Sequence, residues 1–187
     1  MAKVISFTND KVFELTVDER PFSHKPEGAE VGSIRNRLKE EGAIKSLTLV
    51  EITERIAKGC TLMFAVCTPG STVATDIQRQ QLFGIDIDQK NLFLERLPSD
   101  AALKRCARKG GIFKPIILYQ TMSSTPENER YRLVFASEDV LEGRESIDKY
   151  ANRLMALFPE ADQSSADTCR MFFGSNGQVR RLWEEGD

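Results

Sequence analysis

The sequence predicts an α+β domain in which helices pack on a mixed or antiparallel β-sheet. Stretches with the two-residue period of a strand alternate with stretches of helical period, and two strand-like stretches, 112–120 and 131–136, are close enough to form a hairpin. The length of 187 residues fits one medium-sized domain, and 41% hydrophobic with 29% charged residues is ordinary for a globular protein. Together these observations favour one packed domain without internal repeats.

The first 80 residues are expected to form a small N-terminal α/β elaboration of that domain. Two apolar runs within 3–16 flank an Asn-Asp turn signal and predict a hairpin. The polar stretch 18–32 contains Pro and Gly and predicts a loop, and a short helix is expected over 34–38. The N-terminal unit should therefore precede the main sheet without forming a separate domain.

A helix over 48–58 is predicted by its two ends and by an apolar stripe of helical period between them. Thr48 and Glu51 have the spacing of a capping box, and Gly59 stands where a helix ends. The next run, 61–67, has the composition of a buried strand and is ended by a Pro-Gly-Ser sequence. We therefore expect a helix followed directly by a strand.

Residues 81–187 are expected to form the half of the domain that carries the catalytic core. A strand is predicted over 81–88 and a helix over 99–108, which ends at a Gly-Gly pair. Apolar residues recur at helical spacing over 147–158, where Pro159 ends the helix. The tail after Gly177 is polar and charged and is expected to be a linker or a truncated end.

Several classes of protein and site are not expected. No apolar run approaches the roughly 20 residues of a membrane span, and the N-terminus lacks a signal-peptide core, so a cytoplasmic protein is expected. The four cysteines, Cys60, Cys67, Cys106 and Cys169, form no CxxC pair and predict reduced thiols. With His24 as the sole histidine, a zinc site of usual spacing is not expected.

The strand over 81–88 carries the first candidate site. In the sequence QLFGIDID the apolar residues alternate with Gly84, Asp86 and Asp88, which places both carboxylates on one face, roughly 6.5–7 Å apart at the backbone. Two such carboxylates suit Mg²⁺ or Mn²⁺. The alternative is a pair of acids that keeps the end of a strand soluble. Because this strand is strongly apolar, we favour a site in which a metal or cationic side chains balance the two charges.

Two further groups could bind phosphate or complete the metal site. Ser123 and Ser124 lie in a turn that could offer backbone N–H groups to an anion, and Arg132 interrupts an apolar strand with a side chain suited to phosphate. The alternatives are plain turn chemistry for the serines and a surface-facing strand residue for the arginine. After Pro159 the chain carries a third group, Asp162, Asp167 and Arg170. Either aspartate could be a metal ligand or a loop cap, and the arginine could reach a triphosphate.

A basic stretch could contact nucleic acid although the net charge is -2. A local patch rather than the total charge holds phosphates. The stretch contains no acid, and the alternative is the solvated face of a helix. Its cations are Lys104, Arg105, Arg108, Lys109 and Lys114.

Three of these blocks, in this order and spacing, resemble the archaeo-eukaryotic primase (primase-polymerase) superfamily, in the form found in phage and plasmid replication proteins. GIDID at 84–88 resembles the first acidic motif, SSTPENERYRLVF at 123–135 is similar to the second-motif region, and EADQSSADTCRMFFG at 160–174 is similar to the third. The resemblance covers about residues 80–175. It implies an RRM-like sheet with an accessory N-terminal unit, and primer synthesis from NTPs or dNTPs on a single-stranded DNA template.

The resemblance also implies roles for individual residues. Asp86, Asp88 and Asp162 would hold Mg²⁺ or Mn²⁺, and Ser123 or Ser124 would match the small residue of the second motif. The second motif usually ends in a histidine that contacts the nucleotide, whereas here Arg132 takes the strand-start position and cannot transfer protons near neutral pH. Many relatives precede a helicase domain, which makes such a domain or subunit an expected partner.

These expectations converge on a template-directed primase-polymerase of a phage, plasmid or other mobile element. Two rivals remain open from the sequence. The first is a DNA-binding replication-initiator module that has lost catalysis, which the missing histidine favours. The second is a metal-dependent nuclease, which would use the same acids.

Overall fold

The computed structural model describes residues 10–88, 96–108 and 113–182, the side chain of Arg108 excepted. It contains two antiparallel sheets and four α-helices, which confirms the predicted α+β class. The first apolar run of the hairpin expected over 3–16 lies outside the described residues. What is described there is one strand, β1 (Val12–Asp18), which pairs with β2 (Ile44–Thr48) and β3 (Thr61–Met63).

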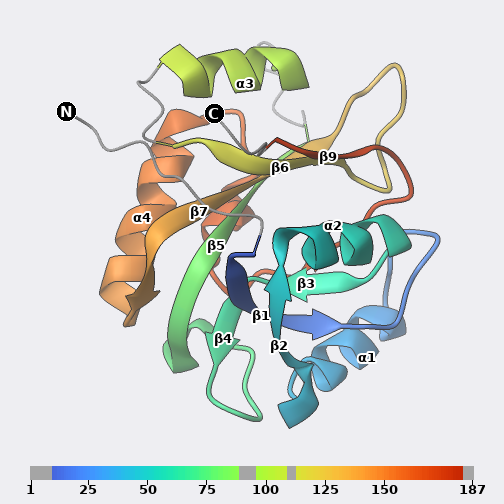
Figure 1. Cartoon of the computed structure of the whole chain (residues 1–187). Helices are drawn as coiled ribbons and strands as arrows, with labels where there is room; N and C mark the ends of the chain where they lie inside the picture. Colours follow the sequence, from blue (N-terminus) through green and yellow to red (C-terminus); the bar gives the residue numbers. More distant parts are fainter. Residues whose placement is uncertain (1–9, 89–95, 109–112, 183–187) are drawn as a thin grey trace.

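The smaller sheet has the strand order β2-β1-β3-β8 and is covered by α2 (Leu49–Lys58) (Figure 1). β2 was not predicted from the sequence, because its run IKSLT has little apolar alternation. The predicted capping box is present: the Thr48 hydroxyl accepts a hydrogen bond from the Glu51 amide, and the Glu51 carboxylate accepts one from the Thr48 amide. Gly59 ends α2 with a φ of 87°, as its position predicted.

The strand predicted over 61–67 is two strands in different sheets. β3 belongs to the smaller sheet and β4 (Ala65–Cys67) to the larger, and Phe64 is the residue between them. The whole run is buried, so its composition is that of one strand and gives no sign of the break. The chain therefore passes from one sheet to the other within one residue.

The larger sheet has the order β4-β5-β7-β6-β9, with every pairing antiparallel. Its long strands are β5 (Ile77–Ile87) and β7 (Tyr131–Glu142), and β6 (Pro115–Gln120) completes the predicted hairpin. The tail predicted to be a linker instead supplies β9 (Val179–Arg181), which pairs with β6. A strand of three residues carries too little alternation to be recognised from its sequence.

The two faces of the larger sheet pack against different partners. α4 (Arg144–Leu157) and α3 (Ser99–Arg108) share one hydrophobic cluster with the β5 residues Phe83, Ile85 and Ile87, as the alternation along β5 predicted. α1 (Ala29–Arg37) also contributes Ile34 to this cluster, and it begins earlier than the predicted helix over 34–38. The opposite face packs against α2 and the smaller sheet.

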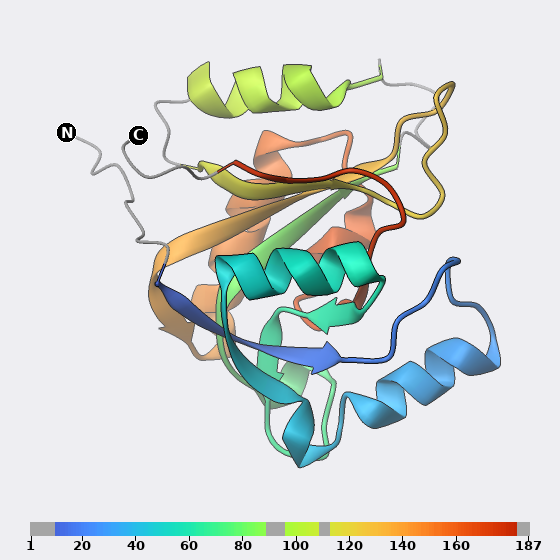
Figure 2. The ribbon, with the colours of Figure 1, turned by 45° about the vertical axis from the view of Figure 1, so that its right-hand side comes forward.

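The two predicted parts of the chain interleave in the sheets. β4 from the first 80 residues joins the larger sheet, whereas β8 (Phe172–Phe173) from the second part joins the smaller one. Figure 2 shows α1 and α3 at opposite ends of the molecule, as does Figure 1. In the part of the chain that the structure describes, no helix has the length and apolarity needed to cross a membrane.

Candidate active site

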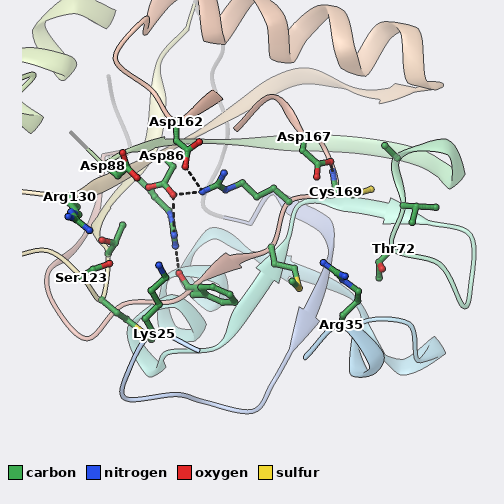
Figure 3. A pocket seen from close by; sticks show the side chains of 18 of the residues that line it. Lys25, Arg35, Thr72, Asp86, Asp88, Ser123, Arg130, Asp162, Asp167 and Cys169 are labelled. Carbon is green, nitrogen blue, oxygen red and sulfur yellow. Dashed lines mark hydrogen bonds and ion pairs between the residues drawn. The ribbon is translucent and has the colours of Figure 1, made fainter. Parts of the chain in front are cut away.

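Five segments that lie far apart in the sequence line one cleft of about 830 Å³. It contains the predicted metal- and phosphate-binding residues other than Ser124: Asp86, Asp88, Ser123, Arg132, Asp162 and Arg170, with the alternative acid Asp167. Figure 3 shows Asp86, Asp88 and Asp162 at one end, which we call the acidic end, and Arg35 and Thr72 at the other. The cleft therefore joins the three blocks on which the resemblance rests.

The acidic end is built on the last residues of β5. Asp86 lies directly opposite Arg132 of β7 in the strand register, and Asp88 follows the end of β5 on the same face. Both aspartates are buried, with 4% and 8% of their surface exposed. The alternation that places three apolar residues of β5 in the core thus directs both carboxylates into the cleft.

The segment after α4 is fastened to the backbone of Asp86. The Asp86 amide donates a hydrogen bond to the Ser165 hydroxyl at 3.0 Å, and its carbonyl accepts one from the Asp162 amide at 2.9 Å. One carboxylate oxygen of Asp162 caps the short 3₁₀ turn Gln163–Ala166 by accepting from Ser164, while the other faces Arg170 at 3.3 Å. Asp162 is therefore both a cap and a member of the acidic end.

Asp167 occupies a different place from Asp162. Its carboxylate accepts a hydrogen bond from the Cys169 amide at 3.0 Å, and it lies beside Cys169 in Figure 3. Asp162 and Asp86 share Arg170 as an ion-pair partner, and no such link joins Asp167 to Asp86 among the described contacts. Of the two candidate third acids, the structure groups Asp162 with Asp86.

Two arginines neutralise Asp86 at the same carboxylate oxygen. Oδ2 lies 2.7 Å from Nη2 of Arg170 and 3.3 Å from Nη2 of Arg132. The other oxygen, Oδ1, is buried and has no hydrogen-bond partner among the described residues. The expectation that cations balance these buried charges is thus met in part by the protein's own side chains, and one oxygen of Asp86 is left over.

Arg132 is a buried residue of the core and is 7% exposed. Its guanidinium lies between the rings of Tyr119 and Phe172, each centroid 5.6 Å away, and it donates hydrogen bonds to the Tyr119 hydroxyl and the Phe173 carbonyl. Burial lowers the pKa of Arg132, but Tyr119 and Asp86 raise it by more, so the net shift is upward and the guanidinium stays charged. Among the described residues, Asp86 is the one carboxylate that forms an ion pair with Arg132.

Gly84 makes room for this arrangement. A Cβ atom added at Gly84 would lie 2.5 Å from the ring of Phe172, far inside van der Waals contact. The guanidinium groups of Arg132 and Arg170 both lie over this ring, with their Cζ atoms 5.6 Å and 5.8 Å from its centroid. The glycine before the two aspartates therefore admits the aromatic ring that supports both arginines.

The two predicted serines have different environments. Ser123 lines the cleft, whereas the Ser124 hydroxyl accepts a hydrogen bond from the Arg130 amide within the 121–130 turn. Ser124 thus has the turn role that was its alternative interpretation. Arg130, which was not predicted, lines the cleft beside Ser123.

The basic stretch on α3 does not line the cleft among the residues that the structure describes. Both guanidinium nitrogens Nη1 and Nη2 of Arg105 lie 2.7 Å from the Glu160 carboxylate, and Nη1 also donates to the Leu157 carbonyl. Lys114 borders a separate apolar hollow formed with α3. Lys104 is exposed, and Lys109 with the Arg108 side chain lies outside the described residues.

Besides Arg130, three further cations that the sequence analysis does not single out line the cleft among the described residues. We call Lys25, Arg35 and Lys39 the basic wall; all three are exposed, and no described acid pairs with them. Arg35 and Lys39 are four residues apart and lie on one side of α1 and its end. That spacing is the signal in the sequence, but two cations at the end of a helix also suit its dipole, so the spacing alone does not indicate a binding surface.

The acidic end can bind Mg²⁺ or Mn²⁺ if a substrate supplies some of the oxygen ligands. No three His, Cys, Asp or Glu side chains of the described ranges are close enough together to hold a metal by themselves. Mg²⁺ usually keeps several waters and uses one or two carboxylates plus substrate phosphates, which the pair Asp86–Asp88 can supply. The buried, unpartnered Oδ1 of Asp86 is the ligand position that fits such an ion.

No protein-family model matches the chain, and no curated protein matches its sequence at a significant level. Among solved structures, the AEP domain of the cyanophage S-2L primase-polymerase is similar over 77% of this chain and 73% of that one, with a TM-score of 0.43 and 11% sequence identity. At this level of similarity the match assigns neither family nor activity to the chain.

Proposed function

We propose that the chain is a metal-dependent nucleotidyltransferase domain of the primase-polymerase type, which extends a nucleic-acid strand from NTPs or dNTPs on a DNA template. The observation that carries the proposal is the cleft: it brings the three acids, the Ser123 turn and Arg170 together from separate parts of the chain. A phage, plasmid or other mobile-element replication protein, with a helicase domain or subunit as partner, is the proposed context.

The acids would provide the catalytic centre. Asp86 and Asp88 would hold Mg²⁺ or Mn²⁺, with Asp162 as a third acid, and the bound ions would supply charge neutralisation at the phosphates and a more acidic attacking hydroxyl. Arg132 would act as a positioning residue, since its guanidinium is buried against Asp86 rather than open to solvent. This role differs from the direct nucleotide contact expected from the sequence.

The cations of the cleft would hold the phosphates. Arg170 is 19% exposed at its side chain and next to the acidic end, which suits a contact to the triphosphate, together with Ser123 and Arg130. The exposed basic wall suits the backbone of the template strand, because exposed cations without acidic partners bind phosphates independently of sequence. Phosphoryl transfer depends mostly on such positioning and charge neutralisation, so a missing histidine does not preclude it.

One observation favours a second candidate function. Two arginines pair with Asp86, so protein side chains already offset the charge of this carboxylate. A DNA-binding initiator module that has lost catalysis would need no more than this and the basic wall. It differs from the first proposal in one testable respect: its single-strand binding would be indifferent to Asp88.

The deciding experiment measures incorporation of labelled nucleotide on a single-stranded template with Mg²⁺ or Mn²⁺, with and without a primer. Asp88→Asn and Asp162→Asn are compared with Asp139→Asn, an exposed residue of β7 remote from the cleft. Product that requires metal and is lost in the first two variants alone supports the transferase. Template binding without product in any protein supports the initiator module, and shortened template strands identify a nuclease.

A further inference from the structure

Two cysteines that are 102 residues apart in the sequence meet in the wall of the cleft. The Sγ atoms of Cys67 and Cys169 are 3.5 Å apart, and both thiols are free and buried. Cys169 lines the cleft, which gives a small molecule a path to the pair. The other two cysteines are separate, since the Cys60 thiol donates to the Glu19 carbonyl and Cys106 is a core residue of α3.

Thiol chemistry also separates this pair from the other cysteines. Burial raises the pKa of Cys106 to about 11 and raises that of Cys60 as well, which keeps both protonated. At Cys67 the hydrogen bond with Cys169 lowers the pKa, against the opposing effects of burial and of the nearby Asp76 and Asp167. The same hydrogen bond, together with burial, raises the pKa of Cys169, so Cys67 is the member of the pair that more readily forms the reactive thiolate.

The backbone around both residues can bring the sulfurs together. A disulfide has an S–S length of about 2.05 Å, so the two sulfurs must approach by about 1.5 Å. Cys67 ends β4 beside a shift in the strand register, and Cys169 lies in the irregular segment between the 3₁₀ turn and β8. Neither residue is in the middle of a helix or a long strand, where such a movement would break several backbone hydrogen bonds.

We propose that Cys67 and Cys169 are an oxidative modification site at which a peroxide forms a reversible disulfide across the wall of the cleft. One thiolate attacks the O–O bond of hydrogen peroxide, giving a sulfenic acid and, after protonation, one water. The second sulfur attacks the sulfenic sulfur, the S–S bond forms, and the hydroxyl leaves as a second water. Two thiols are oxidised, one peroxide is reduced, and a dithiol reductant restores the original state.

The disulfide would act on the candidate active site through the neighbouring residue. Arg170 follows Cys169 directly and is ion-paired with both Asp86 and Asp162. A covalent bond from Cys169 to β4 fixes the segment that carries Arg170 to the larger sheet. The formation of the bond does not depend on the proposed function; its effect on the acidic end is the part that does.

The test treats the folded protein with hydrogen peroxide, blocks the remaining thiols and maps cystine by mass spectrometry. Cleavage after Lys and Arg leaves Cys60 and Cys67 in one peptide, 59–79, so the assay uses Cys60→Ser to make the assignment unique. We expect a Cys67–Cys169 crosslink in monomeric protein, its removal by dithiothreitol, and its loss in Cys67→Ser and in Cys169→Ser. Cys106→Ser, as the matched control, should keep the crosslink.

A second measurement keeps the proposal testable if a serine variant folds poorly. Amide hydrogen exchange over 163–171 is compared between oxidised and reduced protein of unaltered sequence, and we expect slower exchange in the oxidised form. A crosslink between any other pair, or only sulfinic acid at single cysteines, overturns the proposal. A crosslink that leaves the exchange of 163–171 unchanged removes the link to Arg170, whatever the enzymatic activity turns out to be.

Discussion

Nη2 of Arg170 lies 2.7 Å from Oδ2 of Asp86, the carboxylate that we propose as a metal ligand. Arg132 approaches the same oxygen from the neighbouring strand. Two arginines thus offset the charge of Asp86 at Oδ2, and a metal bound at the unpartnered Oδ1 has to share this carboxylate with them.

Replacing Asp86 with Asn should destabilise the fold as well as remove a metal ligand. The change leaves the buried Arg132 without its carboxylate, and breaking one side of a buried ion pair costs about 3 kcal/mol or more. Urea denaturation measures the loss, with Asp139→Asn as the exposed control. Equal stability of Asp86→Asn and the parent protein would mean that the Arg132–Asp86 contact contributes nothing, and the loss should shrink when Arg132→Met is added.

Replacing Arg170 with Gln should raise the affinity for Mn²⁺ in the absence of nucleotide. The arginine and the ion compete for Asp86, and a coupling of this kind typically changes affinity by about fivefold or more. Electron paramagnetic resonance of free Mn²⁺ gives the dissociation constant. Arg144→Gln, whose partner is the exposed Asp148 on α4, should leave it unchanged. Weaker Mn²⁺ binding in Arg170→Gln would show that Arg170 supports the site instead of competing for it.

Replacing Gly84 with Ala should cost about 1–3 kcal/mol of stability, because the new methyl group overlaps the Phe172 ring in a packed core. Thermal or urea unfolding measures the change. Gly32→Ala is the matched control: it lies in α1 with open space around it, and alanine there should stabilise the helix by up to about 1 kcal/mol. Adding Phe172→Leu should restore part of the stability lost in Gly84→Ala. It should not change the effect of Gly32→Ala, because Gly32 is not in contact with Phe172.

The two basic surfaces can be told apart by the salt dependence of single-strand binding. Arg35→Gln with Lys39→Gln removes two cations of the basic wall and should weaken binding while lowering the slope of log affinity against log salt by about 1.4, at about 0.7 per phosphate contact. Fluorescence anisotropy of a labelled oligonucleotide gives both quantities. Lys104→Gln with Lys114→Gln removes the same charge near α3 and should change neither. The reverse result would return the nucleic-acid interface to α3.

Arg105 and Glu160 should contribute stability that disappears in acid. The hydrogen bonds from Arg105 hold the pKa of Glu160 below its usual 4.5, against a smaller effect of burial. A depressed carboxylate pKa gives stability that is present above the unfolded-state pKa and lost as the pH falls through the folded-state value. Glu160→Gln should therefore cost about 1 kcal/mol at pH 7, and the difference should vanish well below pH 4 in a urea series. A difference that persists at low pH would assign the effect to packing.

The sequence predicts the parts of the fold that depend on local periodicity. The alternation of β5 correctly separates Phe83, Ile85 and Ile87 from the two aspartates, and Thr48 and Glu51 correctly mark the start of α2. It does not predict β8 or β9, because strands of two or three residues are defined by their partners rather than by their own pattern. The exchange of sheets at Phe64 is hidden for the same reason.

The composition of the cleft is only partly accessible from the sequence. The acids stand out because charge in an apolar strand is locally unusual, whereas the cations of the basic wall look like any exposed helix and loop. The ion pair that fixes Arg105 joins residues 55 positions apart, so the sequence could not decide between the two interpretations of this arginine. Motif order does not show that Arg132 faces Asp86; strand register does.

The single residue between β3 and β4 limits how this protein could be divided or recombined. Because the chain crosses at Phe64 and later returns through β8, a fragment that begins at residue 81 would lack β4 and leave β8 without β3. Two edges of hydrogen-bonding backbone would then be open, a recognised cause of aggregation. Expression of this region as a shorter module, or its fusion to another protein, should therefore retain the strands from β1 onward and treat the two sheets as one inseparable building block.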